Sequence, residues 1–162
     1  YMEGLDLPPL DEAQFKGEME RVYAPLLSRD EEGIRPVEMK ERLQRLMDEY
    51  AGGISQFYRT NEERLDYALR HIAVLQSQFR YLRATDSHEL MQAMETVDRV
   101  VHHLKARKET RWAGWQTRSD YPERDDAHFD CFIESRRDPA TGEVSTFTRP
   151  YEQIIPGDRH TA

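Results

Sequence analysis

The chain has 162 residues, enough for one domain, and 33% of them are charged while only 38% are hydrophobic. Ordinary globular domains are roughly 45–50% apolar by a similar count, so the core is expected to be thin. Acidic residues outnumber basic ones by 31 to 23, which gives a net charge of −8. This balance opposes non-specific binding to nucleic acid, because such binding depends on Lys and Arg neutralising phosphates. A thin core suits helices laid against another domain, or a small and highly solvated bundle.

The single cysteine and the start of the chain set further limits. Cys131 has no internal partner for a disulfide, so we expect a reducing compartment. No run of 18 or more apolar residues is present, so no membrane-spanning helix is expected. The first residues lack the basic and apolar regions of a signal peptide, and the sequence opens on Tyr1, which favours an excised fragment of a longer chain.

A weak apolar stripe predicts a first helix that ends near Pro25. Its members are Phe15, Met19, Val22 and Tyr23. A stronger stripe follows Pro36, a residue that favours the first turn of a helix. Its members, spaced by three and four residues, are Met39, Leu43, Leu46, Met47 and Tyr50. Gly52-Gly53 then ends this helix or marks a close packing point, because glycine inside a helix costs about 1 kcal/mol relative to alanine.

Two cap motifs predict the next helices. Thr60-Asn61-Glu62-Glu63 has the Thr-x-x-Glu form of a capping box, in which side chains satisfy free backbone N–H groups. The stripe behind it consists of Leu65, Ala68, Leu69, Ile72, Leu75, Phe79 and Leu82. Asp86-Ser87-His88-Glu89 is the second cap, and the stripe behind it consists of Leu90, Met94, Val97, Val101 and Leu104. Helices joined by such short connections usually pack antiparallel.

The helical period stops near residue 108. Beyond it, the runs 129–135 and 144–149 flank Asp138-Pro139-Ala140-Thr141-Gly142, whose turn residues favour a β-hairpin. We therefore predict a mainly α fold, with a three- to four-helix up-down bundle over residues 1–108. An irregular segment, a short hairpin and a frayed tail follow over residues 109–162. The two parts are expected to form one structural unit.

The histidines form no metal-binding motif. His102 and His103 are adjacent and point to different faces of a helix, which is poor geometry for sharing an ion. His71 and His88 lie on separate predicted helices without a His-Glu-x-x-His type motif. We therefore expect solvated or core histidines and no metal site. Cys131 lies in a predicted strand without a CxxC partner, which favours a buried structural thiol over a nucleophile.

One segment, residues 107–126, differs from the rest and is called the Arg/Trp strip. It holds five Arg or Lys residues, five carboxylates, one Tyr and both Trp residues of the chain, without an amphipathic period. Arginine–carboxylate pairs and aromatic anchors are typical of interfaces. We therefore favour a surface that docks on another domain or subunit over an internal ion-pair network or a catalytic site. The predicted interface residues are Glu109, Arg111, Trp112, Trp115, Arg118, Asp120, Tyr121, Arg124, Asp125 and Asp126.

The strip resembles the C-terminal signature of the succinate dehydrogenase/fumarate reductase flavoprotein family. That family carries a Glu-Ser-Arg-Gly-Ala-His type run and a later Phe-Pro-x-Arg-Asp-Asp type run. The matching stretches here are Glu109-Thr110-Arg111 and Tyr121-Pro122-Glu123-Arg124-Asp125-Asp126. In place of Gly-Ala-His stands Trp112-Ala113-Gly114-Trp115, which is more similar to the alpha subunit of dissimilatory adenylylsulfate reductase. Residues 47–55 with 60–62, 138–143 and 149–156 also resemble that enzyme, so the likeness spans roughly residues 36–156.

The resemblance implies a parent flavoprotein with FAD in an N-terminal domain. The parent would interconvert adenylylsulfate with AMP and sulfite, and electrons would pass to an iron–sulfur beta subunit in the cytoplasm. The family's flavin-binding glycines and its substrate-binding His and Arg lie upstream, and none maps onto this sequence. Gly52-Gly53 is not a GxGxxG motif, and no predicted strand precedes it. No catalytic or cofactor-binding residue is therefore expected here, and the expected role is to pack on the flavin domain and support subunit assembly.

Other functions stay open. The same domain from a fumarate reductase or succinate dehydrogenase type paralogue is an alternative, although the departure from Gly-Ala-His argues against that chemistry. A stand-alone helical adaptor would bind a protein partner through the strip. An independent hydrolase or metalloenzyme has the least support from the sequence. If the chain is an isolated domain, its docking face is exposed, and self-association through that face is expected.

Overall fold

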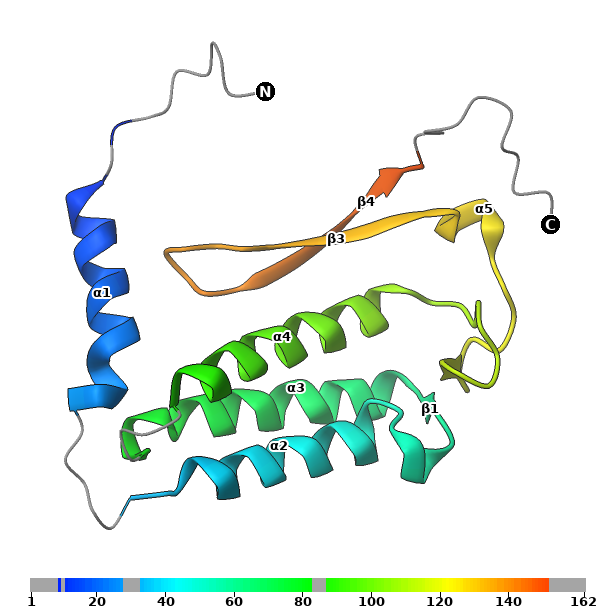
Figure 1. The fold of residues 1–162 in the computed structure, drawn as a ribbon. Coiled ribbons are helices and arrows are strands. Elements are labelled where there is room, and N and C mark those ends of the chain that lie inside the picture. Colours follow the sequence, from blue (N-terminus) through cyan, green and yellow to red (C-terminus); the bar gives the residue numbers. More distant parts are fainter. Residues whose placement is uncertain (1–8, 10, 28–32, 83–86, 152–162) are drawn as a thin grey trace.

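The computed structural model describes residues 9, 11–27, 33–82 and 87–151. Three helices form a bundle: α2 (Pro36–Tyr50), α3 (Glu62–Ser77) and α4 (Ser87–Ala106). They run in alternating directions, and each of them contacts the other two (Figure 1). The predicted mainly α class with an up-down bundle is confirmed.

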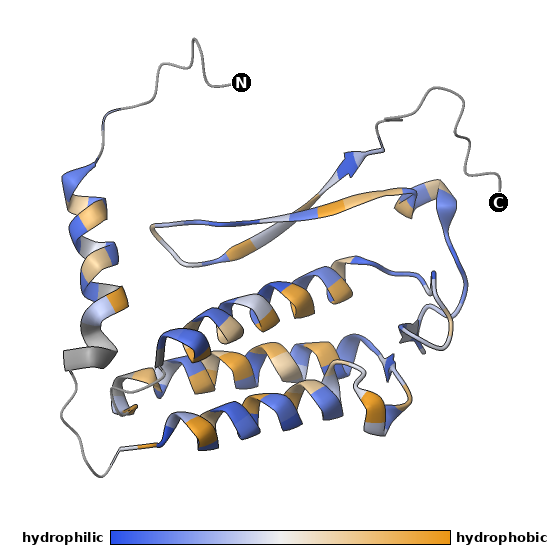
Figure 2. Ribbon diagram, in the orientation of Figure 1, coloured by the Kyte–Doolittle hydropathy of each residue, from blue (hydrophilic) through white to orange (hydrophobic). Residues whose placement is uncertain are grey.

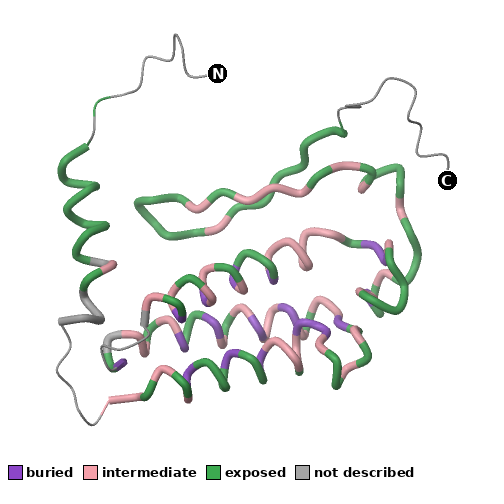
Figure 3. The backbone as a smooth tube through the Cα atoms, viewed as in Figure 1, coloured by how far each residue is buried: buried purple, intermediate pink, exposed green. Residues whose placement is uncertain are grey.

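The predicted stripes build the core of the bundle. Its buried helical members are Met39, Leu43 and Leu46 from α2, Leu65, Ala68, Ile72 and Leu75 from α3, and Leu90, Met94 and Val101 from α4. Hydrophobic and buried positions recur along these three helices (Figures 2 and 3). Burying such a side chain stabilises the fold by roughly 1.5–3 kcal/mol relative to leaving it exposed. The stripes therefore provide the main driving force for folding.

The glycine pair ends α2 and also permits a close approach. Gly52 has a φ of +84°, in the left-handed region that favours glycine. A Cβ on Gly53 would lie 2.3 Å from Oδ1 and 2.4 Å from Cα of Asp48, so a larger residue would force the backbone to move. Both readings of the pair, helix terminus and close packing point, are confirmed.

The cap of α3 differs from the predicted capping box. Asn61 is the N-cap, and its side chain accepts a hydrogen bond from the N–H of Arg64 at 2.9 Å. Thr60 instead lies in the short strand β1 (Arg59–Thr60), and its hydroxyl donates to the Tyr50 carbonyl at 2.7 Å. The prediction of Thr60 as the cap is wrong, because its backbone pairs within β1 and its hydroxyl binds the last residue of α2.

The connection between α3 and α4 also carries part of a predicted stripe. α3 ends at Ser77, so Phe79 lies in the 3-10 helix η2 (Phe79–Tyr81) and the buried Leu82 follows it. α4 begins at Ser87, and the predicted cap residue Asp86 lies outside the described residues.

α1 (Glu12–Leu27) stands beside the bundle and contacts η2 and α4 (Figure 1). It extends to Leu27, so Pro25 lies in its last turn and does not end it. Its apolar residues Phe15, Met19 and Tyr23 are exposed, although the ring of Tyr23 also meets His88 edge to face. The bundle core therefore comes from three helices, and the first predicted helix is a separate side element.

The predicted antiparallel hairpin is formed by β3 (Cys131–Arg137) and β4 (Val144–Pro150) and contacts α4 (Figure 1). A hairpin of two strands is only marginally stable by itself, so its attachments matter. One attachment is an ion pair from Nη2 of Arg137 to Oδ2 of Asp98 on α4, at 2.7 Å.

The first strand of the hairpin begins later than predicted. Phe129 ends the short helix α5 (Asp126–Phe129), which the sequence analysis did not predict. Asp125 caps this helix, because its carboxylate accepts from the N–H of His128. Within the described ranges, no helix is long and apolar enough to cross a membrane.

Candidate functional site

The Arg/Trp strip lies at the end of the bundle where α2 and α4 end and α3 begins. Its strand β2 (Thr117–Arg118) pairs in parallel with β1. The N–H of Thr117 donates to the Tyr58 carbonyl, and the N–H of Ser119 donates to the Thr60 carbonyl, both at 2.9 Å. This pairing joins the helical part of the chain to the irregular segment and fixes the position of Arg118.

Arg118 is the centre of the first ion-pair cluster and is only 1% exposed. Its Nη1 donates to the carbonyls of Leu104 and Arg107, at 2.5 Å and 3.1 Å. These carbonyls are available because α4 ends at Ala106. The guanidinium therefore places a positive charge at the negative end of the α4 dipole.

Two carboxylates neutralise this guanidinium. Asp120 accepts from Nε and Nη2 of Arg118 at 2.9 Å and 2.8 Å, a bidentate pair, and Glu62 accepts from Nη2 at 2.9 Å. Oδ2 of Asp120 also accepts from the N–H of Glu62, the first residue of α3, at 2.8 Å. This pair of a buried arginine and a partly exposed aspartate thus joins the C-terminus of α4 to the N-terminus of α3, with the favourable charge at each end.

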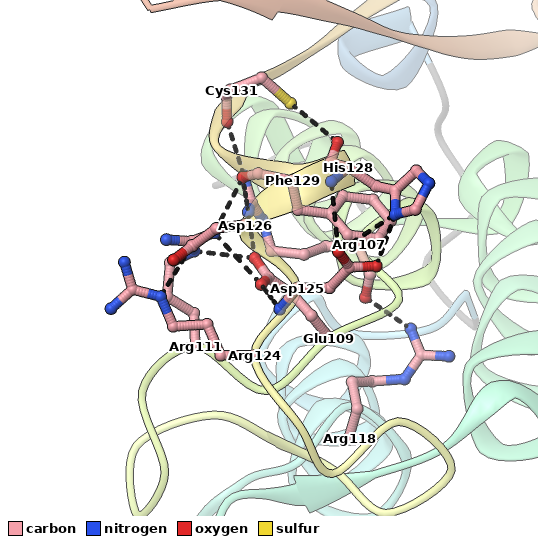
Figure 4. A network of polar contacts seen from close by, with 10 residues as sticks. All are labelled: Arg107, Glu109, Arg111, Arg118, Arg124, Asp125, Asp126, His128, Phe129 and Cys131. Carbon is pink, nitrogen blue, oxygen red and sulfur yellow. Dashed lines mark hydrogen bonds and ion pairs between the residues drawn. The ribbon is translucent and has the colours of Figure 1, made fainter. Parts of the chain in front are cut away.

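Glu109 is the centre of the second cluster and is 3% exposed (Figure 4). Its carboxylate accepts from Nη1 of Arg107 at 2.5 Å, Nε of Arg111 at 2.8 Å and the N–H of Asp125 at 2.9 Å. Both arginines also donate to the carbonyl of Phe129, at 2.9 Å and 3.1 Å. This cluster therefore ties the end of α4 to α5 and to the start of the hairpin.

Glu109 and Asp120, one carboxylate from each cluster, are held in their charged forms. Burial acts to raise the pKa of Glu109, but the hydrogen bonds from Arg111, the Asp125 backbone and Arg107 outweigh it and lower that pKa. The hydrogen bonds from Arg118 lower the pKa of Asp120 against the effect of burial. General acid–base catalysis works best with a pKa near the operating pH. The clusters therefore fit a structural role.

We expect the free energy of unfolding to fall as the pH drops below about 4.5. A carboxylate with a lowered folded-state pKa contributes stability that is fully present above its unfolded pKa, roughly 4, and is lost as the pH falls through the folded pKa. Urea unfolding between pH 7 and pH 3 measures this profile. Asp120→Asn should flatten it, whereas Glu143→Gln in the exposed hairpin turn should not. An unchanged slope in Asp120→Asn would assign the acid sensitivity to other groups.

The two tryptophans of the strip face solvent. Trp112 and Trp115 are 70% and 74% exposed. They flank a tight turn in which Gly114 has a φ of +91° and the N–H of Trp115 donates to the Trp112 carbonyl. The Trp115 ring lies 6.1 Å from the ring of Tyr58. Because the indoles project from a turn fixed by the clusters, they are the members of the strip most available to a partner.

The ten predicted interface residues differ in how they are placed. The residues that take part in the clusters or the α5 cap are Glu109, Arg111, Arg118, Asp120 and Asp125. Asp126 also belongs to the Glu109 cluster, because it pairs with Nη2 of Arg111 at 2.9 Å as well as with Arg124. The residues exposed outside the clusters are Trp112, Trp115 and Arg124. Tyr121 is half-buried, with the guanidinium of Arg118 5.1 Å from its ring. The strip therefore contains an internal ion-pair network, and docking by its exposed residues stays a prediction.

Sequence reasoning did not select Glu62, Arg107 or Thr110, which complete the clusters. The Thr110 hydroxyl accepts from the N–H of Arg118 at 2.9 Å and donates to the Tyr121 carbonyl at 2.8 Å. A signal for Arg107 was present, because Arg107, Glu109 and Arg111 alternate. In an extended segment, residues two apart lie on the same face.

Comparison with known proteins places this geometry in a family. A family model described as the fumarate reductase flavoprotein C-terminus matches residues 40–156. The chain belongs to this family. The resemblance inferred from the strip is thereby confirmed, and the matched residues include most of the helical bundle, the strip and the hairpin.

Adenylylsulfate reductases are among the most similar relatives. The alpha subunit from Megalodesulfovibrio gigas is 35% identical over 133 residues, which cover 78% of this chain and 20% of the relative. The structure of adenylylsulfate reductase from the hyperthermophilic Archaeoglobus fulgidus shares 38% identity, with a TM-score of 0.75, over 92% of this chain and 26% of that one. The chain therefore spans about a fifth to a quarter of the length of these relatives.

Fumarate reductases share the fold. Escherichia coli quinol fumarate reductase superposes with a TM-score of 0.68 over 92% of this chain and 27% of its own, at 23% identity. At this level of identity the likeness extends to the fold alone.

The N-terminus of α3, where a strand leads into a helix, does not fit the pyrophosphate of FAD, the cofactor of a flavoprotein. A flavin pyrophosphate binds at a helix N-terminus whose N–H groups are free, after a strand and a glycine-rich turn. β1 leads into α3, but there the side chains of Asn61 and Asp120 already accept from backbone N–H groups. Glu62 and Glu63 add negative charge in the first turn. In the described part of the chain, no three His, Cys, Asp or Glu side chains are grouped to hold a metal ion.

Proposed function

We propose that this chain is the C-terminal domain of an FAD-dependent oxidoreductase subunit of the adenylylsulfate reductase type. It packs on the flavin domain of the parent chain and supports assembly with an iron–sulfur beta subunit in the cytoplasm. FAD is held by the flavin domain, and this domain contributes no catalytic residue. The observation that carries the proposal is that two buried ion-pair clusters hold Trp112 and Trp115 outward at one end of the bundle.

Tryptophan is enriched at interface hot spots, because a large rigid ring gains contact area at low entropic cost. A fixed base, meaning residues that hold the turn in one position, keeps that entropic cost low, since the turn does not have to become ordered on binding. The two clusters provide this base, so the strip as a whole suits a permanent interface. The family match favours a docked domain over a stand-alone adaptor.

The identity to adenylylsulfate reductases, 35–39%, exceeds the 22–24% to the fumarate reductase and succinate dehydrogenase structures. This difference supports the adenylylsulfate reductase type over the fumarate reductase alternative. The substrate pair adenylylsulfate and AMP with sulfite is proposed for the parent on this basis. Without its flavin domain, the 162-residue chain is expected to self-associate through the exposed tryptophans.

Replacing both tryptophans tests the proposed docking. In the full-length flavoprotein, Trp112→Ala/Trp115→Ala is expected to lower the yield of FAD-loaded, subunit-assembled protein by about tenfold or more, since each hot-spot residue contributes about 2 kcal/mol. The helical content of the 162-residue chain, measured by circular dichroism, should stay unchanged because both rings are exposed.

The matched control is Phe147→Ala, which removes an exposed aromatic ring from β4. It should assemble like the wild type. Full FAD loading and normal subunit assembly in the double tryptophan variant would contradict the proposed role of the strip.

A further inference from the structure

A second exposed apolar element lies beside the tryptophans, in the loop that joins α2 to β1. This loop contains the 3-10 helix η1 (Ile54–Gln56), and it was predicted only as the end of a helix. Its Ile54 and Phe57 side chains are 74% and 78% exposed. Both values match or exceed those of the two tryptophans, so the loop presents its apolar side chains to the outside as fully as the strip does.

The backbone of this loop is held in a conformation that is unfavourable for its residues. Phe57 and Tyr58 have φ values of 51° and 58°, and they are the described non-glycine residues with positive φ. The left-handed region costs free energy for any residue with a Cβ, and it is rarer still in consecutive positions. Such conformations persist only where the surrounding structure enforces them, and they are concentrated at functional sites.

Hydrogen bonds on both sides enforce the conformation. The N–H of Tyr58 donates to the Gly53 carbonyl at 3.1 Å, and the Tyr58 carbonyl accepts from the N–H of Thr117 at 2.9 Å. The N–H of Ser55 donates to the Asp48 carboxylate at 3.1 Å. The loop is therefore a built, rigid feature. Within the described chain, however, the exposed Phe57 ring gains little packing that would offset the strain.

The loop and the turn of the strip are neighbours in the structure. Tyr58 connects them, because its ring lies 6.1 Å from the ring of Trp115 and its carbonyl is bound to β2. We call Ile54, Phe57, Trp112 and Trp115 the apolar patch. With each side chain about three quarters exposed, the patch presents on the order of 500 Å² of apolar surface. This is near the upper end for a monomer and about two thirds of one side of a standard interface.

We propose that Phe57 is an anchor of the interface with the flavin domain of the same polypeptide, and that the strained loop exists to present it. The inference rests on the proposed function and adds the loop to the docking surface. Three of the four members of the apolar patch are aromatic, a residue class enriched in the cores of stable interfaces. The relatives carry about three quarters of their chain outside the region matched here, so a covalently attached occupant of sufficient size is available.

Removal of the strain gives the first test, made on the 162-residue chain. Phe57→Gly should leave the melting temperature unchanged or raise it by a few degrees, because glycine adopts a positive φ freely and the lost ring is exposed. A fall of several degrees would show that the ring packs within this domain, and the inference would be overturned.

Cross-linking in the full-length, FAD-loaded flavoprotein with its partner subunit gives the second test. A photoreactive benzoylphenylalanine replaces Phe57 in one sample and Trp112 in another, and mass spectrometry maps the products. We expect both positions to cross-link to the flavin domain of the same chain. Replacement of Phe147 is the matched control and should give at least tenfold less of that product.

The outcomes separate the two proposals. Cross-linking from position 112 but not from position 57 would overturn the inference and leave the proposed docking by the strip intact. Cross-linking from position 57 to the partner subunit, or to a second copy of the chain, would overturn the choice of occupant. No product from either position would overturn both proposals.

Discussion

Replacement of Arg118 by leucine is expected to lower the free energy of unfolding by about 2–4 kcal/mol, below the full cost of breaking a buried ion pair because the carboxylates left behind are partly exposed. The guanidinium is almost fully buried and serves two carboxylates and the free carbonyls of α4. Leucine leaves Asp120 without its arginine and Glu62 with Lys105 alone, 3.6 Å away, and it leaves the Leu104 carbonyl without its donor. For a chain of this size, the melting temperature should fall by roughly 10 °C.

Two further variants separate charge from geometry. Arg118→Lys keeps the charge but loses the planar fork that binds Asp120 through two atoms, so it should recover only part of the loss. Arg124→Leu removes an arginine of the same strip whose ion pair with Asp126 is half exposed, and it should change stability by less than about 1 kcal/mol. Equal effects of Arg118→Leu and Arg124→Leu on the free energy of unfolding would show that burial of the arginine does not determine how much its ion pair stabilises the fold.

The elements of the fold that the sequence predicts are those whose signal is local. The stripes from Met39 to Leu104 follow the helical period, so the three bundle helices and their antiparallel order were predicted. The two runs around residues 138–142 likewise gave the hairpin. α5 was missed, because four residues are too few to carry a period and Phe129 fits a strand pattern equally well.

The sequence predicted which segment forms the site, but not which side chains and carbonyls lie together there. The strip stood out by composition alone, yet Arg118 pairs with Glu62, 56 positions away in the sequence, and with carbonyls at the end of α4. The hydrophobic periodicity of the sequence contains no information about such distant partners. Thr60 likewise has a distant partner. A local motif predicted it as a helix cap, but it lies in β1 and pairs with β2. Phe57 and Tyr58 gave no signal, because a left-handed conformation is normally marked by glycine or asparagine.

A second substitution with a large expected effect concerns the hairpin, because polar contacts attach it to the rest of the domain. The buried hydrophobic cluster draws its described members from the three helices, Ala51 and Leu82, and from neither hairpin strand. The hairpin is held by the ion pair of Arg137 with Asp98 and by the Glu109 cluster. Its stability should therefore depend on Glu109 more than on any apolar contact.

Glu109→Leu is expected to cost about 3 kcal/mol and to act locally. Arg107 and Arg111 lose the carboxylate that orients them, and their hydrogen bonds to the Phe129 and Cys131 carbonyls should weaken as a result. Hydrogen exchange, followed by mass spectrometry, should show faster exchange of the β3 and β4 amides. Exchange in α2 and α3 should stay close to that of the wild type, because their core does not include the cluster.

A double-mutant cycle with Arg111→Leu tests whether the pair itself is responsible. Arg111→Leu alone leaves Glu109 with Arg107 and the Asp125 N–H, while the double variant removes both charges of the pair. We expect a coupling free energy of about 1.5–3 kcal/mol between the two positions, within the range for residues of one network. If the two losses simply add, Glu109 stabilises the hairpin through Arg107 and the Asp125 backbone. Since both clusters also fix the turn that carries Trp112 and Trp115, the same variants should loosen the proposed docking surface in the full-length flavoprotein.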